Sequence, residues 1–223
     1  MNKNAEKFTL AGNAGMMEGL IDYPKSDTPL GIALVAHPHP LYGGTMDNKV
    51  AVTLARTFAG LGYVVARINF RGVGASEGVH DHGHGETDDM AILHAWMTEQ
   101  YPGLPVALGG FSFGTFVQSK LAQRLAAAGT PAERLVLVGS AAKKWDMADI
   151  PADTILIHGE NDDTIPLIDV LDWLRPQDIP VIVIPGADHF FHRKLQHIKS
   201  WVTQLWRRPS EVADTETDTA TAD

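Results

Sequence analysis

Short apolar runs that alternate with helical patterns constrain the fold of this chain most. The runs at 31–36, 63–69, 105–109, 135–138, 154–158 and 181–184 are nearly continuous in apolar residues. Apolar residues recur at helical spacing at 47–61, 87–101, 115–128 and 192–206. Strands that are apolar throughout are typical of a parallel sheet covered by helices on both faces. The sequence therefore predicts an α/β fold.

Two more strands are expected near the N-terminus, at 7–11 and 16–23, before a turn at 24–29. Together these elements predict a mostly parallel, doubly wound sheet of about eight strands flanked by helices. No internal repeat and no Pro- or Ser-rich linker divides the chain, so we expect a single domain over residues 1–209. Ligands of such sheets bind beyond the carboxyl ends of the strands, where we expect the functional residues to gather.

Composition excludes several classes of function. The chain has 223 residues, of which 44% are hydrophobic, and no cysteine, so it offers no disulfide, thiolate metal site or cysteine nucleophile. The net charge is −9, and the segment 210–223, with five acidic and no basic residues, is expected to form a disordered acidic tail. The absence of a basic stripe argues against a nucleic-acid partner.

The same reading predicts no association with membranes. The first residues lack the long apolar stretch of a secretory signal, and no apolar run approaches the roughly 18 residues that cross a bilayer. We therefore expect a cytoplasmic protein. Its oligomeric state is left open by the sequence.

The motif Gly110-Phe-Ser-Phe-Gly114 lies between an apolar strand and a helix. A serine with glycine two residues away on each side, in this context, is the pattern of a nucleophile elbow. The turn is so tight that the serine adopts a strained backbone conformation, and only hydrogen fits at the two glycine positions. Ser112 is therefore the candidate nucleophile.

A serine hydroxyl needs a base, and the base needs a carboxylate that orients it. Residues 159–166 follow the fifth of the six main runs and contain Asp162, while residues 185–190 follow the sixth and contain His189. Asp163 is adjacent to Asp162, and Glu160 and Asp188 lie nearby. Gly159 and the spacing to Pro166 favour Asp162, and we expect Asp163 to be solvated or capping and Asp188 to be a turn residue.

Taken together, these motifs resemble those of the α/β-hydrolase superfamily. Residues 158–166 look like its H-G-x-x-D-x-x-V-P acid turn, and residues 186–190 are similar to its histidine turn. Residues 37–44 and 69–74 resemble a compact branch near the dienelactone-hydrolase-like serine esterases. The resemblance implies an α/β-hydrolase fold in which Ser112 is the nucleophile, His189 the general base and then acid, and Asp162 the orienting carboxylate.

The resemblance also implies two backbone donors for an oxyanion. One is the N–H after the nucleophile, on Phe113, and the other comes from the loop after an earlier strand. That loop begins His37-Pro-His-Pro40, and proline has no N–H. His39 is therefore the expected second donor, with Leu41 behind it. The more familiar H-G-G-G pattern is absent.

Several polar residues near these motifs have two interpretations. We expect His37 and His158 to be buried imidazoles that hydrogen-bond neighbouring loops. The residues His80, His82 and His84 indicate a solvated loop, with a metal site as the alternative. Arg71 is expected to pair with Glu77 or Glu86, with an anionic substrate group as the alternative. The tryptophans Trp96 and Trp201 lie on apolar helix faces and are expected in the core.

Only residues 139–153 separate the strand at 135–138 from the next one, which is too short for a cap domain. We therefore expect an open site with three candidate pocket residues: Tyr42, Trp145 and Phe190. The predicted activity is hydrolysis of small carboxylic esters through an acyl-enzyme, with no cofactor and no metal. A thioesterase or small peptidase could use the same residues. A non-catalytic binding module and a metal-dependent hydrolase built on 80–84 are the remaining alternatives.

Overall fold

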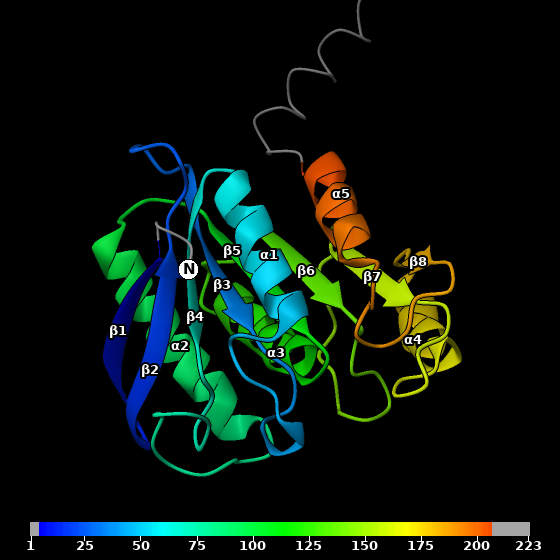
Figure 1. Ribbon diagram of the computed structural model, residues 1–223, viewed down its shortest axis with the longest axis horizontal. Coiled ribbons are helices and arrows are strands. Elements are labelled where there is room, and N and C mark those ends of the chain that lie inside the picture. The colour runs from blue at the N-terminus through cyan, green and yellow to red at the C-terminus, as the bar shows by residue number, and fades with distance from the viewer. Residues whose placement is uncertain (1–4, 207–223) are drawn as a thin grey trace, which may run out of the picture.

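Eight strands form one sheet in the order β1-β2-β4-β3-β5-β6-β7-β8 (Figure 1). The structure is a computed structural model and describes residues 5–206, so the predicted tail at 210–223 lies outside the described residues. The two N-terminal strands pair antiparallel with each other, β2 is antiparallel to β4, and all other pairs are parallel. The strands are β1 (Ala5–Gly12), β2 (Gly15–Asp22), β3 (Gly31–Ala36), β4 (Tyr63–Ile68), β5 (Val106–Phe111), β6 (Arg134–Val138), β7 (Ile155–Gly159) and β8 (Ile182–Ile184).

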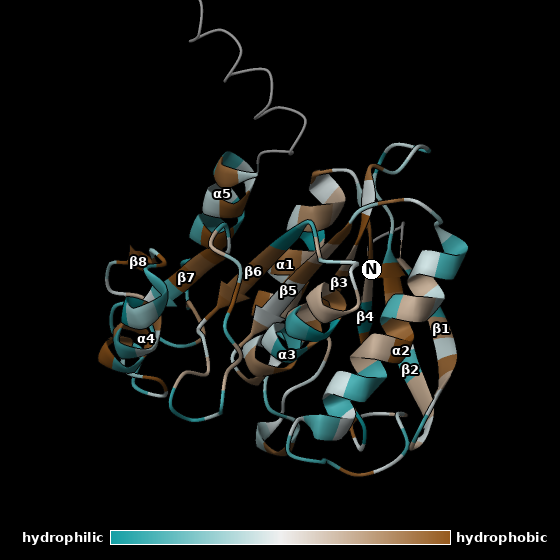
Figure 2. Cartoon of the chain, turned by 180° about the vertical axis from the view of Figure 1, so that it is seen from behind, coloured by the Kyte–Doolittle hydropathy of each residue, from teal (hydrophilic) through white to brown (hydrophobic). Residues whose placement is uncertain are grey.

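Helices cover both faces of the sheet, which confirms the predicted doubly wound α/β architecture. One face is covered by α1 (Lys49–Gly60) and α5 (Leu195–Leu205), and the other by α2 (His84–Gln100), α3 (Phe113–Ala127) and α4 (Leu167–Leu174). Two 3₁₀ turns, Pro40–Tyr42 and Arg175–Gln177, complete the elements. Each face has its own apolar core, and in Figure 2 β6 and β7 are largely brown whereas α2 and α3 are of mixed colour.

The central strands are buried on both sides, as their apolar runs predict. Every residue of β3 and β4 is buried. Helix α1 begins where the Asn48 side chain accepts the N–H groups of Val50 and Ala51, at 2.9 and 3.4 Å. Helix α2 begins at His84, three residues before the predicted start, because Gly83 forms its N-cap and Glu86 returns to the Gly83 N–H.

The last helix is shorter than predicted, beginning at Leu195 and not at 192. The residues before it form a tight turn: the Asp188 carboxylate accepts the backbone N–H of His192, at 3.0 Å, and contacts the ring of that residue. Phe191 and Arg193 have φ of 52° and 62°, which an α-helix does not allow. The expected core position of Trp201 is also wrong: the residue is 38% exposed, because Ile198 and Val202 fill the contact with the sheet.

Among residues 5–206 no helix is both long and apolar enough to span a membrane. The parallel strands β3 to β8 end at the same edge of the sheet, and the loops that carry the sequence motifs follow β3, β5, β7 and β8. The topology therefore brings these loops together.

Candidate active site

Ser112 lies at the turn between β5 and α3, in a conformation that non-glycine residues rarely adopt. Its φ and ψ are 55° and −123°. A Cβ atom on Gly110 would lie 2.5 Å from the Gly114 carbonyl oxygen, and one on Gly114 would lie 2.3 Å from that of Ala36. Both glycines are therefore required by backbone that passes too close for a side chain.

A chain of short polar contacts joins Ser112, His189 and Asp162. The distance from Ser112 Oγ to His189 Nε2 is 2.9 Å, and that from His189 Nδ1 to Asp162 Oδ2 is 2.7 Å. All three residues are buried, with 9%, 3% and 5% of their surface exposed. The structure thus brings together, from three separate loops, the three residues expected to act on the substrate.

The surroundings of Asp162 define the proton positions in this chain. Its second oxygen, Oδ1, accepts the backbone N–H groups of Thr164 and Ile165, at 3.0 and 2.7 Å. Backbone N–H groups only donate, so Oδ1 acts as an acceptor. A carboxylate that also accepts at Oδ2 takes its hydrogen bond from the Nδ1–H of His189, and in that tautomer Nε2 is able to accept the Ser112 hydroxyl proton.

Backbone hydrogen bonds join the turn that carries Asp162 to the turn that carries His189. The N–H groups of Glu160 and Asn161 donate to the carbonyls of Ile184 and Ala187, at 3.1 and 2.9 Å. The Gly186 N–H donates back to the Glu160 side chain at 2.7 Å. This connection fixes Asp162 relative to His189, and it gives Glu160 different partners from those of Asp162.

The other acidic residues near the site also have different partners. Asp188 holds His192 in the turn before α5. Asp163 is exposed and contacts only the neighbouring Thr164 hydroxyl, at 3.5 Å. Of the four acids weighed from the sequence, Asp162 is therefore the one in contact with the base.

His158 is a buried neighbour of the same carboxylate. Its Nε2 lies 2.9 Å from the Ile165 carbonyl oxygen and 3.5 Å from Asp162 Oδ2. Burial lowers its pKa, which favours a neutral ring that donates from Nε2. His158 thereby supports the turn that holds Asp162.

His37 connects the loops after β3 and β4. Its Nδ1 donates to the Pro38 carbonyl at 2.6 Å and its Nε2 accepts the Phe70 N–H at 2.9 Å. Burial lowers the pKa of this ring to about 4, so it is neutral near pH 7.

The two expected oxyanion donors lie next to Ser112 from different sides. Phe113 is the first residue of α3, so its N–H has no acceptor within the helix and lies at the positive end of the helix dipole. The rings of His39 and Phe113 are in contact, with centroids 4.9 Å apart. The Leu41 N–H donates to His39 Nδ1 at 3.2 Å and is therefore engaged, which favours His39 over Leu41 as the second donor.

Two adjoining cavities of about 280 and 430 Å³ open at Ser112. Tyr42 lines both cavities, Trp145 lines the smaller one and Phe190 the larger one. Thr164 and Lys144 line both cavities as well. The position of Thr164 at the cavities was not predicted from the sequence, although the residue lies in the same turn as Asp162. Neither cavity has an Asp or Glu among its lining residues.

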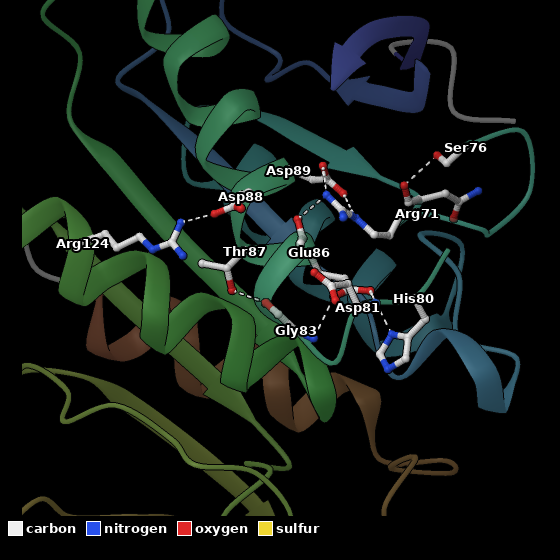
Figure 3. Close-up of polar contacts among 12 residues, drawn as sticks. Arg71, Ser76, His80, Asp81, Gly83, Glu86, Thr87, Asp88, Asp89 and Arg124 are labelled. Atoms are coloured by element: carbon white, nitrogen blue, oxygen red, sulfur yellow. Dashed lines mark hydrogen bonds and ion pairs between the residues drawn. The ribbon is translucent and has the colours of Figure 1, made fainter. Parts of the chain in front are cut away.

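The three histidines at positions 80, 82 and 84 do not share one site. His80 turns inward and its Nδ1 lies 2.8 Å from Glu86 Oε1 (Figure 3). His82 and His84 are exposed. Within residues 5–206 no group of three or more His, Cys, Asp or Glu side chains is arranged to hold a metal ion.

The expected partners of Arg71 are wrong. Its guanidinium forms two 2.8 Å hydrogen bonds with the Asp89 carboxylate and a third with the Gly85 carbonyl (Figure 3). Asp89 lies one turn of α2 after Glu86. The loop after β4 therefore contacts α2 further along the helix than the sequence suggested. Arg71 is therefore a structural residue that fixes α2 to the loop after β4.

Comparison with known proteins defines the family. A family model described as X-Pro dipeptidyl-peptidase (S15 family) matches residues 20–154, which is more than half of the chain. The chain is an α/β hydrolase of the S15 family. The matched segment of this S15 chain includes Ser112 and ends before Asp162 and His189, so the positions of the acid and base rest on the geometry above.

Two relatives match most of the chain, one in structure and one in sequence. The crystal structure of XC6422 from Xanthomonas campestris, a member of the α/β serine hydrolases without lid, is 34% identical, with a TM-score of 0.84 over 92% of this chain and 94% of that one. The uncharacterized protein RP471 of Rickettsia prowazekii (strain Madrid E) is 35% identical over 83% of this chain and 82% of its own length.

A third relative matches over a shorter stretch. The lysophosphatidylserine lipase ABHD12 of Danio rerio is 35% identical over 46% of this chain, and the match spans only 28% of the lipase. The similarity therefore concerns part of the hydrolase domain and not the whole of that enzyme.

Proposed function

We propose that this chain is a serine hydrolase that cleaves carboxylic esters of small molecules through an acyl-enzyme, with Ser112, His189 and Asp162 as its catalytic residues. The observation that carries the proposal is the contact chain from Ser112 Oγ through His189 to Asp162, at 2.9 and 2.7 Å. This arrangement activates a hydroxyl that is otherwise a weak nucleophile.

The first half of the reaction follows from the proton positions. Ser112 Oγ attacks the ester carbonyl carbon while its proton moves to His189 Nε2, and the positive ring is stabilised by Asp162. The carbonyl oxygen becomes an oxyanion that the N–H groups of Phe113 and His39 stabilise. The C–O bond to the alcohol then breaks as His189 gives its proton to the leaving oxygen, which leaves Ser112 acylated.

Water completes the cycle by the same route in reverse. His189 takes a proton from the water, the hydroxide attacks the acyl carbon, and the proton returns to Ser112 Oγ as the acid leaves. Each step uses the same base and the same two N–H donors, so one geometry serves both halves.

Ester hydrolysis has support from the relatives and from the cavity. The partial match to a lysophosphatidylserine lipase links this type of domain to ester substrates. The loop at 139–154 contains no helix, so no lid formed by this segment covers the site and an ester can reach Ser112 from solvent.

A dipeptidyl-peptidase activity is the second candidate, because the family model carries that description. Such an enzyme binds the α-ammonium group of its substrate, and a carboxylate is the usual partner for a buried ammonium. The cavities at Ser112 contain Lys144 and no Asp or Glu among their lining residues. This charge pattern favours an ester over a peptide with a free N-terminus.

The test compares wild type with Ser112→Ala on three substrates: p-nitrophenyl acetate, an acyl thioester and Ala-Pro-p-nitroanilide. We expect wild type to hydrolyse the acetate best and Ser112→Ala to lose at least about four orders of magnitude in kcat. Preference for the anilide would establish the peptidase, and preference for the thioester a thioesterase. If wild type turned over none of these substrates and were not labelled by a fluorophosphonate, the chain would be a non-catalytic binding module.

A further inference from the structure

His80 lies against His39 and Phe113, the two proposed oxyanion donors. It is not part of the contact chain from Ser112 through His189 to Asp162. Its ring centroid is 4.7 Å from that of His39 and 5.5 Å from that of Phe113. The side chain is only 5% exposed. It is therefore a buried polar ring that touches both side chains of the proposed hole.

Glu86 anchors this ring. The Glu86 side chain is 0% exposed, and its Oε1 accepts from His80 Nδ1 at 2.8 Å and from the Asp81 N–H at 3.0 Å. Its Oε2 accepts the Gly83 N–H at 2.8 Å, at the start of α2 (Figure 3). Three hydrogen bonds and the N-terminal end of a 17-residue helix thus hold the carboxylate that holds the ring.

The ring of His39 is joined to its own loop. Burial lowers the pKa of His39, and a positive charge on His80 would lower it further, so the ring is neutral and accepts the Leu41 N–H through Nδ1. The His39 carbonyl accepts from Tyr42 and Gly44, at 3.2 and 3.0 Å. A shift of the His39 ring therefore also moves the backbone that carries its N–H.

We propose that His80 is a positioning residue: its ring, anchored by Glu86, holds His39 and Phe113 where their N–H groups meet the oxyanion. The inference rests on the proposed ester hydrolysis and adds to it. Donors must lie within hydrogen-bond distance of an oxygen that exists only in the transition state. A displacement of about 1 Å is enough to cost up to about a hundredfold in rate.

Two variants separate the contact with the hole from the contact with Glu86. His80→Asn keeps an amide N–H where Nδ1 lies, so it preserves the hydrogen bond to Glu86 while it removes the ring. His80→Phe keeps a ring against His39 and Phe113 while it removes the hydrogen bond. His84→Ala is the matched control, because His84 is an exposed residue of the same segment.

We measure kcat and KM for p-nitrophenyl acetate, the inhibition constant of an aryl trifluoromethyl ketone, and Tm. For His80→Asn we expect kcat to fall about tenfold with KM nearly unchanged, and inhibition to weaken by the same factor, because the ketone forms an oxyanion adduct. Tm should stay close to that of wild type. For His80→Phe, which keeps the ring but loses its anchor, we expect a lower Tm and a smaller loss in kcat than in His80→Asn.

The proposal is overturned if folded His80→Asn keeps the kcat and ketone affinity of wild type, or if the losses in both variants merely follow Tm. Should His80→Asn not fold, His80→Gln replaces it with the same readouts, because it also lacks the ring and keeps an amide N–H for Glu86. A wild-type chain that hydrolyses no ester overturns the proposed function as well. Activity that is normal in wild type and unaffected in the variants overturns only the role of His80.

Discussion

Helix α3 begins so close to the end of β3 that a Cβ atom on Gly114 would lie 2.3 Å from the carbonyl oxygen of Ala36. The same atom would lie 2.7 Å from the carbonyl oxygen of His37, which belongs to the loop that leads to His39. Gly114 thus lets the helix that begins after Ser112 touch the backbone leading to His39, the proposed second oxyanion donor. The glycine serves the packing of the site as well as the turn.

Gly114→Ala should therefore destabilise the fold. Because both contacts are with backbone, neither can swing away, and we expect the free energy of unfolding to fall by about 3 kcal/mol. Urea unfolding followed by circular dichroism measures the change. Gly60→Ala is the control: nothing lies within 4 Å of the new Cβ and the residue is helical, so stability should rise by up to about 1 kcal/mol. Equal effects of the two substitutions would contradict the account.

Asp162→Asn should reduce kcat for an ester by about three to four orders of magnitude. The amide would present a donor to His189, which favours the ring tautomer that cannot accept the Ser112 proton. Steady-state kinetics and a fluorophosphonate labelling rate both report the loss. Asp163→Asn, at the exposed neighbouring position, should leave kcat and the labelling rate within about twofold of wild type. A large loss in this variant would mean that Asp163, and not Asp162, orients His189.

Tyr42→Ala should raise KM for aryl esters several-fold with little change in kcat. The residue is 87% exposed yet lines both cavities at Ser112, so it contacts the substrate before and during the reaction alike. Leu41 is 69% exposed and lines neither cavity, so Leu41→Ala is the matched control. If the two variants have the same KM, Tyr42 is not part of the substrate pocket.

Stability should decline in mild acid partly because of His37. Burial lowers the pKa of this ring to about 4, from 6.5 in an unfolded chain. Between these values the unfolded chain binds a proton that the folded chain excludes, so the free energy of unfolding falls as the pH drops from about 6.5 to about 4. The contribution of this ring is about 3 kcal/mol over the whole interval. Burial lowers the pKa of His158 as well, which acts in the same direction.

His37→Asn should flatten this dependence. Urea midpoints at several pH values between about 4 and 7 give the slope, and His197→Asn, on the exposed side of α5, is the control. A His37→Asn slope that equals that of wild type would mean that other groups cause the acid sensitivity.

The parts of this molecule that the sequence predicts are those encoded by short segments. The elbow around Ser112 follows from two glycines that the turn requires, and the sheet follows from its apolar runs. The parallel sheet predicted from these runs also explains why residues 162 and 189, which each follow a strand, lie at one edge. These features need no knowledge of distant contacts.

Contacts between distant segments were harder to predict. Arg71 pairs with Asp89. Which acidic residue of α2 lies opposite Arg71 depends on how the whole helix packs, and a short segment of sequence does not determine that packing. The inward turn of His80 depends on Gly83, whose φ of 89° lets Glu86 reach back to three donors. Trp201 is exposed because the apolar stripe of α5 is narrower than the sequence pattern indicates.

The hydrogen bonds from residues 160 and 161 to residues 184 and 187 have a consequence for biosynthesis. The strands β5, β7 and β8, which precede residues 112, 162 and 189, are synthesised in this order and lie in the same order in the sheet, with β6 between β5 and β7. Under the proposed function, a growing chain therefore carries Ser112 without its base until β8 and the turn after it have been synthesised. A chain that ends before residue 189 is accordingly expected to have no esterase activity.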